Sequence, residues 1–215
     1  MKAAMWMATI FLIGTGLLSA QDASRQKLDL PKPQSLVMSK NLAANGTLVL
    51  DMNVGEVRIV RSDEQKTICL TIEPHGFYDD STVQSWVRRF EVAGDRASIE
   101  LKLPKHTDNH DGARVTISLP SETDLKLQLG VGELSVKGIE GNKDLHVGIG
   151  QLTVGIKDSA KYNEIRTGTK IGNAQDGIFH QHSDGFFPKT QHSSLQGIYK
   201  LNATVGIGDV NVVQD

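Results

Sequence analysis

The stretch LKLQLGVGELSV, residues 125–136, decides the fold. Apolar and polar residues alternate along it, which is the pattern of a β-strand with one buried face. The alternation breaks at the second glycine, because Val131 and Leu134 are three positions apart and would face opposite sides of a regular strand. A β-bulge or a sharp corner at Gly132-Glu133 restores the register, and glycine tolerates the backbone angles that such a bend requires. The stretch therefore predicts two short strands joined by a bend.

The same pattern occurs in three further places. Each copy has apolar residues one, three and five positions before a fixed glycine, a polar residue after it, and apolar residues two and four positions after it. The further copies are LVLDMNVGEVRI (48–59), LHVGIGQLTV (145–154) and LNATVGIGDVNV (201–212). The predicted hinge glycines are Gly55, Gly132, Gly150 and Gly208, one in each internal repeat.

The spacing of the glycines favours a stack. Gly132 and Gly150 lie 18 residues apart, and Gly208 follows Gly172, in a weaker copy of the pattern, by 36 residues, twice that distance. We expect an all-β fold in which repeated strand units stack as a β-solenoid or β-roll-like domain. An antiparallel meander with similar spacing is the open alternative.

The first half of the chain is also rich in strand patterns. Three alternating stretches predict strands there: KTICLTIE (66–73), ASIELKL (97–103) and ARVTISL (113–119). One short helix is expected near residues 81–90, capped by Asp80 or Ser81, and a strand over 87–92 is the alternative.

The N-terminal residues have the layout of an export signal. Residues 1–20 form a signal peptide by pattern: Lys2, an apolar run and small residues at the end. Cleavage is expected near Ala20, at a position that the sequence leaves open, and an uncleaved membrane anchor is the alternative. Localisation is then periplasmic, secreted or at the cell surface.

The domain organisation follows from composition. Residues 21–41 form a polar tether with Pro31 and Pro33. The N-terminal β-rich part spans 42–120 and the C-terminal β-repeat part spans 121–215, and we expect one continuous domain from both.

Charge and cysteine content exclude several classes of protein. The 215-residue chain has 23 Lys and Arg against 25 Asp and Glu, so it has no overall basic field for nucleic acid. Cys69 is its only cysteine, so no internal disulfide forms, and Gln21 occupies the place where a lipoprotein needs a cysteine. No motif of a hydrolase, zinc protease or nucleotide-binding loop is present, which predicts a protein that is not an enzyme and carries no cofactor.

One histidine cluster is a candidate metal site. On a strand, His180, His182 and Asp184 would point the same way, and His192 follows them. Imidazole and carboxylate groups bind zinc or copper. Solvated loop histidines are the plainer interpretation, as they are for His106 and His110 in a predicted hairpin loop.

The residues after the glycines form a second candidate. In a stack they would lie about 4.8 Å apart. The neutral amides of Gln151 and Asn173, expected to be neighbours, favour hydrogen-bonded ladders over a cation site. The full row is Glu56, Glu133, Gln151, Asn173 and Asp209.

Four aromatic residues gather in one irregular stretch: Phe179, Phe186, Phe187 and Tyr199. They predict either a binding loop on a rigid scaffold or a plug at the end of the stack.

The repeats GVGELSVKGIEGNKDLHVGIGQLTV and YKLNATVGIGDVNV, with the earlier NGTLVLDMNVGEVRIV, resemble the bacterial putative-adhesin family of exported β-strand-repeat domains. The resemblance covers about residues 42–215 and implies a β-helical or β-roll fold, with function largely unknown in that family. The leading hypothesis is a non-enzymatic envelope module, structural or adhesin-like, whose partner is an envelope protein or polymer. A membrane is expected to be touched only through an uncleaved signal segment. The alternative is a periplasmic metal-binding protein that uses the cluster at His180 and His182.

Overall fold

The computed structural model describes residues 35–76, 78–104 and 112–215, and this part of the chain is almost entirely strand. The strands are β1 (Leu36–Asn41), β2 (Thr47–Arg61), β3 (Thr67–Pro74), β4 (Val87–Ala93), β5 (Arg96–Leu101), β6 (Ala113–Leu119), β7 (Asp124–Val136), β8 (Lys143–Ile156), β9 (Tyr162–Asp176), β10 (Gln181–Phe186), β11 (Lys189–Ser193) and β12 (Tyr199–Gln214). One α-helix, α1 (Asp80–Ser85), and a 3-10 turn (Ser159–Lys161) complete the described part. The all-β prediction is confirmed.

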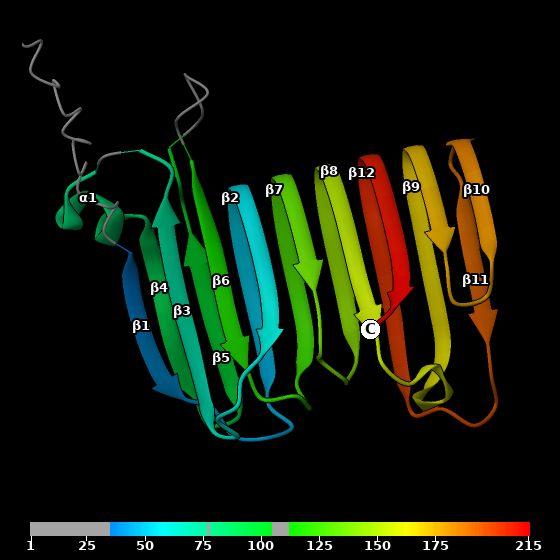
Figure 1. Ribbon diagram of the computed structural model, residues 1–215, viewed down its shortest axis with the longest axis horizontal. Helices are drawn as coiled ribbons and strands as arrows, with labels where there is room; N and C mark the ends of the chain where they lie inside the picture. The colour runs from blue at the N-terminus through cyan, green and yellow to red at the C-terminus, as the bar shows by residue number, and fades with distance from the viewer. Residues whose placement is uncertain (1–34, 77, 105–111) are drawn as a thin grey trace, which may run out of the picture. The chain divides into compact units, whose positions relative to one another are not determined.

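The strands form one sheet of 12 strands that does not close on itself (Figure 1). Its main path runs β1-β3-β6-β2-β7-β8-β12-β9-β10, with β5 beside β2, β4 beside β5 and β11 beside β9. The five long strands pair in parallel, in the order β2, β7, β8, β12 and β9. The shorter strands make antiparallel pairs: β3 pairs with β1 and β6, and β4 pairs with β5. At the other end, β10 and β11 are both antiparallel to β9. Parallel and antiparallel pairing are therefore both present, and a solenoid or roll is not confirmed.

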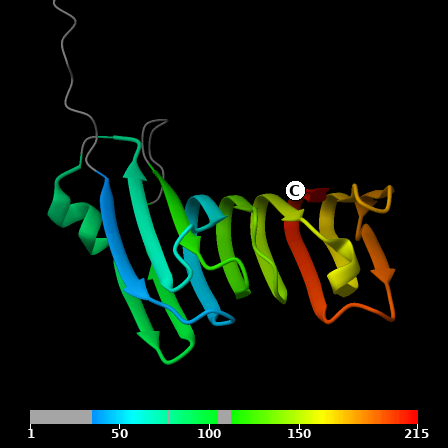
Figure 2. The same ribbon diagram turned by 60° about the horizontal axis from the view of Figure 1, so that its bottom comes forward.

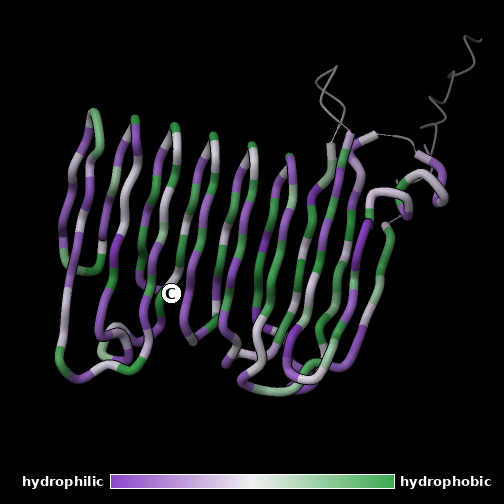
Figure 3. Tube along the Cα trace, turned by 180° about the vertical axis from the view of Figure 1, so that it is seen from behind, coloured by the Kyte–Doolittle hydropathy of each residue, from purple (hydrophilic) through white to green (hydrophobic). Residues whose placement is uncertain are grey.

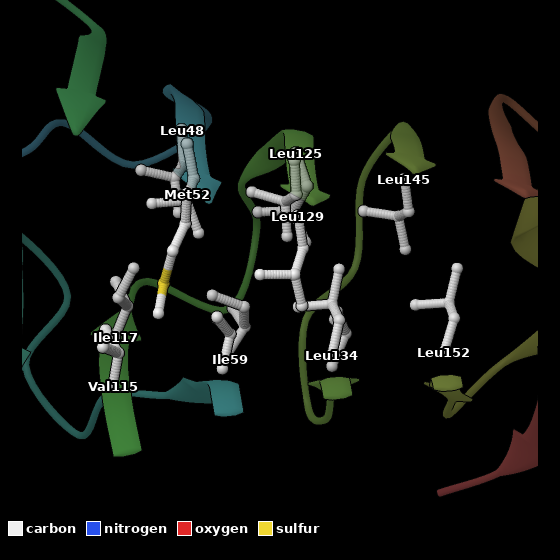
Figure 4. Close-up of a cluster of buried hydrophobic side chains, with 14 of the residues drawn as sticks. Leu48, Met52, Ile59, Val115, Ile117, Leu125, Leu129, Leu134, Leu145 and Leu152 are labelled. Carbon is white, nitrogen blue, oxygen red and sulfur yellow. The ribbon is translucent and has the colours of Figure 1, made fainter. Parts of the chain in front are cut away.

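Each long strand bends in the middle, so that its two halves face each other across the core (Figures 2 and 4). Leu48, Leu125 and Leu145 from first halves lie opposite Leu134 and Leu152 from second halves, and all five are at most 2% exposed. Burying a leucine side chain contributes about 1.5–3 kcal/mol, so this double row of aliphatic side chains is the main stabilising feature.

The hinge glycines allow the bend, as predicted. Gly55, Gly132, Gly150 and Gly208 have φ angles between 131° and 137°, a region that L side chains rarely adopt. They also pair with one another along the stack, so a Cβ atom on Gly132 would overlap the carbonyl oxygen of Gly55.

A regular stack in chain order is not confirmed, because β12 lies between β8 and β9. Asp209 on β12 pairs with Gln151 of β8 on one side and with Asn173 of β9 on the other. The C-terminal strand therefore fills the position that the 18-residue spacing assigns to β9, and β9 is displaced by one strand.

The two ends of the sheet depart from the repeat. Beyond β9, β10 and β11 form a reversed unit: β10 pairs with the second half of β9 and β11 with the first half. At the other end, residues 36–41, assigned from the sequence to the tether, form β1 and pair with β3. The folded part thus begins before Leu42, because Leu36 and Met38 pack against the core and the backbone of residues 36–41 pairs with β3.

The predicted helix near 81–90 is shorter than expected. α1 ends at Ser85, and β4 follows from Val87, so both alternatives are present in succession. Asp79, rather than Asp80 or Ser81, is the N-cap, with its Oδ1 atom accepting a bond of 2.8 Å from the Thr82 backbone amide. No helix within the described residues has the length and hydropathy of a membrane span.

Candidate interaction surface

The bends in the middle of the long strands lie side by side across the sheet and carry an exposed row of aliphatic side chains. These residues directly precede the hinge glycines, and we call them the apolar crest: Val131, Ile149, Ile207 and Ile171, in spatial order, continued by Phe186, which pairs with Ile171. The four aliphatic residues are 45–50% exposed and Phe186 is 79% exposed. Hydrophobic colour returns at successive bends along the upper edge in Figure 3. The sequence pattern placed these residues with the core, which is wrong at this one position of the repeat.

The residues after the glycines form the polar row, which has a different order from the one expected. In space it runs Glu56, Glu133, Gln151, Asp209, Asn173 and Asp184. Gln151 and Asn173 are not neighbours, because Asp209 lies between them and accepts a 2.7 Å hydrogen bond from Nδ2 of Asn173. From Glu133 onward an amide therefore separates each carboxylate from the next, which reduces the repulsion between like charges. Between β12 and β9 the row thus has one amide-to-carboxylate hydrogen bond, in place of the ladder expected between Gln151 and Asn173.

Glu56 at the far end of the row is neutralised by two arginines. Its carboxylate contacts Nε of Arg114 at 3.0 Å and the guanidinium of Arg58 at 2.6 Å. Partial burial acts to raise the pKa of Glu56, but the hydrogen bonds and charges of Arg114 and Arg58 outweigh it and lower that pKa. The uncompensated negative charge of the row therefore lies toward β7, β12 and β10.

A polar groove runs across the second halves of the strands, beside the polar row. It consists of two hollows of about 530 and 260 Å³ that adjoin at Gln151 and Thr153 on β8. Its polar lining combines hydroxyl, amide, cationic and carboxylate groups: Glu56, Arg58, Glu133, Ser135, Lys137, Gln151, Thr153, Asn173, Gln175, His182, Asp209 and Asn211. The aliphatic residues Val57, Val60, Leu134, Leu152 and Val210 also line it. The groove thus extends from β2 to β10 along repeated, equally spaced polar groups.

The sequence contained a signal for this groove that the sequence analysis missed. The residue three positions after each hinge glycine is polar in every copy: Arg58, Ser135, Thr153, Asn211 and Gln175. These residues alternate with the buried ones and so share the outer face of the second halves.

The predicted metal residues are not gathered into one site. His182 and Asp184 share a face of β10, with Nε2 and Oδ2 4.0 Å apart, whereas His180 lies in the preceding turn with a φ of 53°. His192 lies on β11, stacked on the Phe179 ring at 3.5 Å between centroids. Among the described residues no group of three or more His, Cys, Asp or Glu side chains is placed to hold a metal ion.

Metal binding by this cluster stays a prediction. Zinc or copper would raise the melting temperature of the wild type, but not of a His180→Ala/His182→Ala variant, if the site exists. His106 and His110 lie outside the described residues.

The four aromatic residues divide into two pairs. Phe179 and Tyr199 pack against the core, the latter on β12 inside the stack and 5.8 Å from the Tyr162 ring. Phe186 and Phe187 are 79% and 68% exposed in the turn between β10 and β11. Only this second pair is available to a partner.

One buried lysine interrupts the apolar core. Lys143 on β8 is 2% exposed, pairs with leucines on both neighbouring strands and donates a hydrogen bond to the Tyr162 hydroxyl. Burial lowers the pKa of Lys143 to about 8, against the opposing effect of Glu140, Asp124 and Asp215. Burial, followed by the Glu140 charge, raises the pKa of Tyr162. The group is enclosed at the start of the strands and belongs to the scaffold.

Comparison with known proteins supports the fold. A putative cell adhesion protein from Clostridium sporogenes shares it, with a TM-score of 0.53 at 17% identity over 85% of this chain and 100% of that one. Two putative adhesins are more distant. The one from Bacteroides fragilis has a TM-score of 0.29 at 10% identity over 85% of this chain and 99% of that one. The one from Parabacteroides distasonis has a TM-score of 0.26 at 15% identity over 58% of this chain and 55% of that one. No protein-family model and no curated protein matches the sequence. The resemblance to putative adhesins is confirmed at the level of fold.

Proposed function

We propose that this protein is an exported, non-enzymatic module of the bacterial cell envelope that binds an extended polar polymer, such as a polysaccharide, in the polar groove. The proposal includes processing near Ala20, residence in the periplasm or at the cell surface, and a coil-like stack of bent strands that acts as a rigid platform. The fold shared with a protein described as a putative cell adhesion protein supports it.

The observation that carries the proposal is the groove itself. Ser135, Thr153 and Asn211 recur at the same position on adjacent parallel strands, so their hydroxyl and amide groups follow one another at about 4.8 Å. A linear polymer with repeated hydroxyl groups can bind such a series of donors and acceptors along its length. At one end of the groove the ammonium of Lys137 adds a place for an acidic substituent, whereas Arg58 is already paired with Glu56.

The test is affinity electrophoresis of the purified protein through gels that contain polysaccharide from the envelope of the expressing bacterium. Thr153→Arg would obstruct the groove where its two hollows meet, while Gln128→Arg adds the same charge to the outer face of a first half-strand. The wild type and Gln128→Arg should be retarded, and Thr153→Arg should lose about tenfold or more in affinity. Absence of retardation for the wild type, or equal retardation of all three, would contradict the proposal. The same mixtures should release no reducing ends, since no catalysis is proposed.

A further inference from the structure

The apolar crest is unexplained by the groove, since it occupies the bends and not the faces of the sheet. Its aliphatic side chains lie about half exposed on four consecutive strands and end at Phe186. At about 4.8 Å per strand the row is about 19 Å long, and it is one side chain wide. The strip is continuous apolar surface, and burying it against another apolar surface is favourable.

The turn at the end of the crest holds its aromatic residue at a conformational cost. Phe187 has a φ of 55°, in the left-handed region, which bulky residues occupy rarely. Its backbone amide donates a 2.9 Å hydrogen bond to the carbonyl oxygen of Lys170 on β9, which fixes the turn against the neighbouring strand. A strained, exposed aromatic residue that the backbone holds in place is a feature of binding sites.

The glycines make the crest project. In β7, β8 and β12 the crest residue lies between two glycines, as in Gly130-Val131-Gly132. No side chain flanks it along its own strand, so the row projects as a convex edge, although at the β7 end Val131 borders a hollow that Val54 and His75 also line. A convex apolar edge can insert into a fluid lipid bilayer without a preformed site, whereas a folded protein partner would need a groove of matching shape.

Charges on the two sides of the crest fit a zwitterionic headgroup. Glu133 and Asp209 each come two residues after a crest residue, and Asp184 pairs with Asn173 in the same row, so three carboxylates lie on one side of the crest. Lys170 precedes Ile171 on the other side, and its long side chain can reach outward. Headgroups with an outer ammonium and an inner phosphate complement both charges, whereas anionic headgroups would be repelled by the three carboxylates.

The same charges argue against a second copy as the occupant. Two crests in contact would bring two rows of carboxylates together. A strip one side chain wide also buries less than the roughly 1,200 Å² of the smallest stable protein interfaces.

We propose that the apolar crest, with Phe186 and Phe187, docks on the surface of a bilayer that has zwitterionic headgroups. The crest residues enter the boundary between headgroups and acyl chains, and the polar row stays at headgroup level. The groove lies on the adjacent face, so the crest can act whether or not the groove binds polymer, and the two proposals fail separately.

The experiment is flotation of the purified full chain with phosphatidylcholine vesicles. The crest variant Val131→Thr/Ile149→Thr/Ile207→Thr keeps β-branched side chains of similar shape, and Val37→Thr is the matched control, because Val37 is 58% exposed on β1, outside the crest. Circular dichroism and melting curves check that each variant folds. The N-terminal apolar segment is common to all proteins compared, so differences report on the crest.

Wild type and Val37→Thr should float with the vesicles, the crest variant should bind about tenfold or more weakly, and adding phosphatidylglycerol should weaken binding. Equal binding by the crest variant, no binding by the wild type, or binding that requires the anionic lipid would overturn the proposal. Crest-dependent dimerisation in gel filtration without flotation would overturn it in favour of a second copy.

Discussion

The Nδ2 atom of Asn173 on β9 donates a 2.7 Å hydrogen bond to Oδ1 of Asp209 on β12, between residues that are 36 positions apart. This contact exists because β12 lies between β8 and β9. It also keeps a neutral amide between the carboxylates of Asp209 and Asp184 on the flanking strands.

Asn173→Asp should therefore destabilise the protein at neutral pH by about 1–2 kcal/mol, through a lost hydrogen bond and three carboxylates on adjacent strands. Added salt screens the repulsion between the carboxylates, so the difference in free energy of unfolding from the wild type should narrow at high salt. Urea unfolding at low and high salt measures it. Gln175→Glu adds the same charge two residues further along β9, opposite Asn211 and His182, and should show neither effect.

The hinge glycines should not tolerate a side chain. Gly132→Ala combines a φ of 137° with overlap of its Cβ atom and the Gly55 carbonyl oxygen, so a loss of about 3 kcal/mol or more is expected. Gly94→Ala is the control: its φ is 63° but a Cβ atom there meets no atom within 4 Å, so it should cost only about 1 kcal/mol. Similar free energies of unfolding for the two variants would refute the role assigned to the stacked glycines.

We expect the exposed Phe187 to lower the stability of the protein, because its backbone conformation is unfavourable for an aromatic residue. Phe187→Asn places a residue that tolerates the left-handed region at a φ of 55° and should stabilise the protein by about 0.5–1 kcal/mol. Phe186→Asn, at the preceding residue and within β10, should not stabilise the protein, because asparagine is unfavourable in strands. Thermal melting decides the point, and a destabilised Phe187→Asn would show that the ring contributes to packing.

Lys143 should give the protein a distinctive alkaline stability profile. Between pH 8 and pH 10 the unfolded chain keeps a proton on this lysine that the folded protein releases, so the free energy of unfolding rises with pH, by up to about 2 kcal/mol. Above pH 10 the raised pKa of Tyr162 acts in the opposite direction, since only the unfolded tyrosine ionises. Urea unfolding of Lys143→Met should lack the rise between pH 8 and pH 10, and parallel profiles of the two proteins would disprove the assignment.

Much of the fold could be predicted, because it depends on local rules. The three-residue offset between Val131 and Leu134 indicates a bend, and the glycine between them allows it whatever lies on either side. The order of the strands could not be predicted in this way. The pattern around Gly172 and Gly208 is similar, so nothing local specifies which of the two strands pairs with β8.

The candidate surfaces were harder to predict for the same reason. Val131 is an aliphatic residue like those at core positions. It lies at the bend, however, where its side chain does not face the space between the two half-strands, and it is 46% exposed. His182 and His192 are close in sequence, but β10 and β11 pair with opposite halves of β9. Alternation predicts which residues share a face of a strand, and it does not predict where a bent strand exposes them.

The most direct test of the account is a residue-resolved map of polymer binding by NMR. Backbone amide shifts of the purified protein would be followed while oligosaccharides from the envelope polysaccharide are added. The account predicts that perturbations concentrate around Ser135, Thr153 and Asn211 and leave the crest and α1 unchanged. An unperturbed groove, or perturbations that concentrate elsewhere in the sheet, would contradict it.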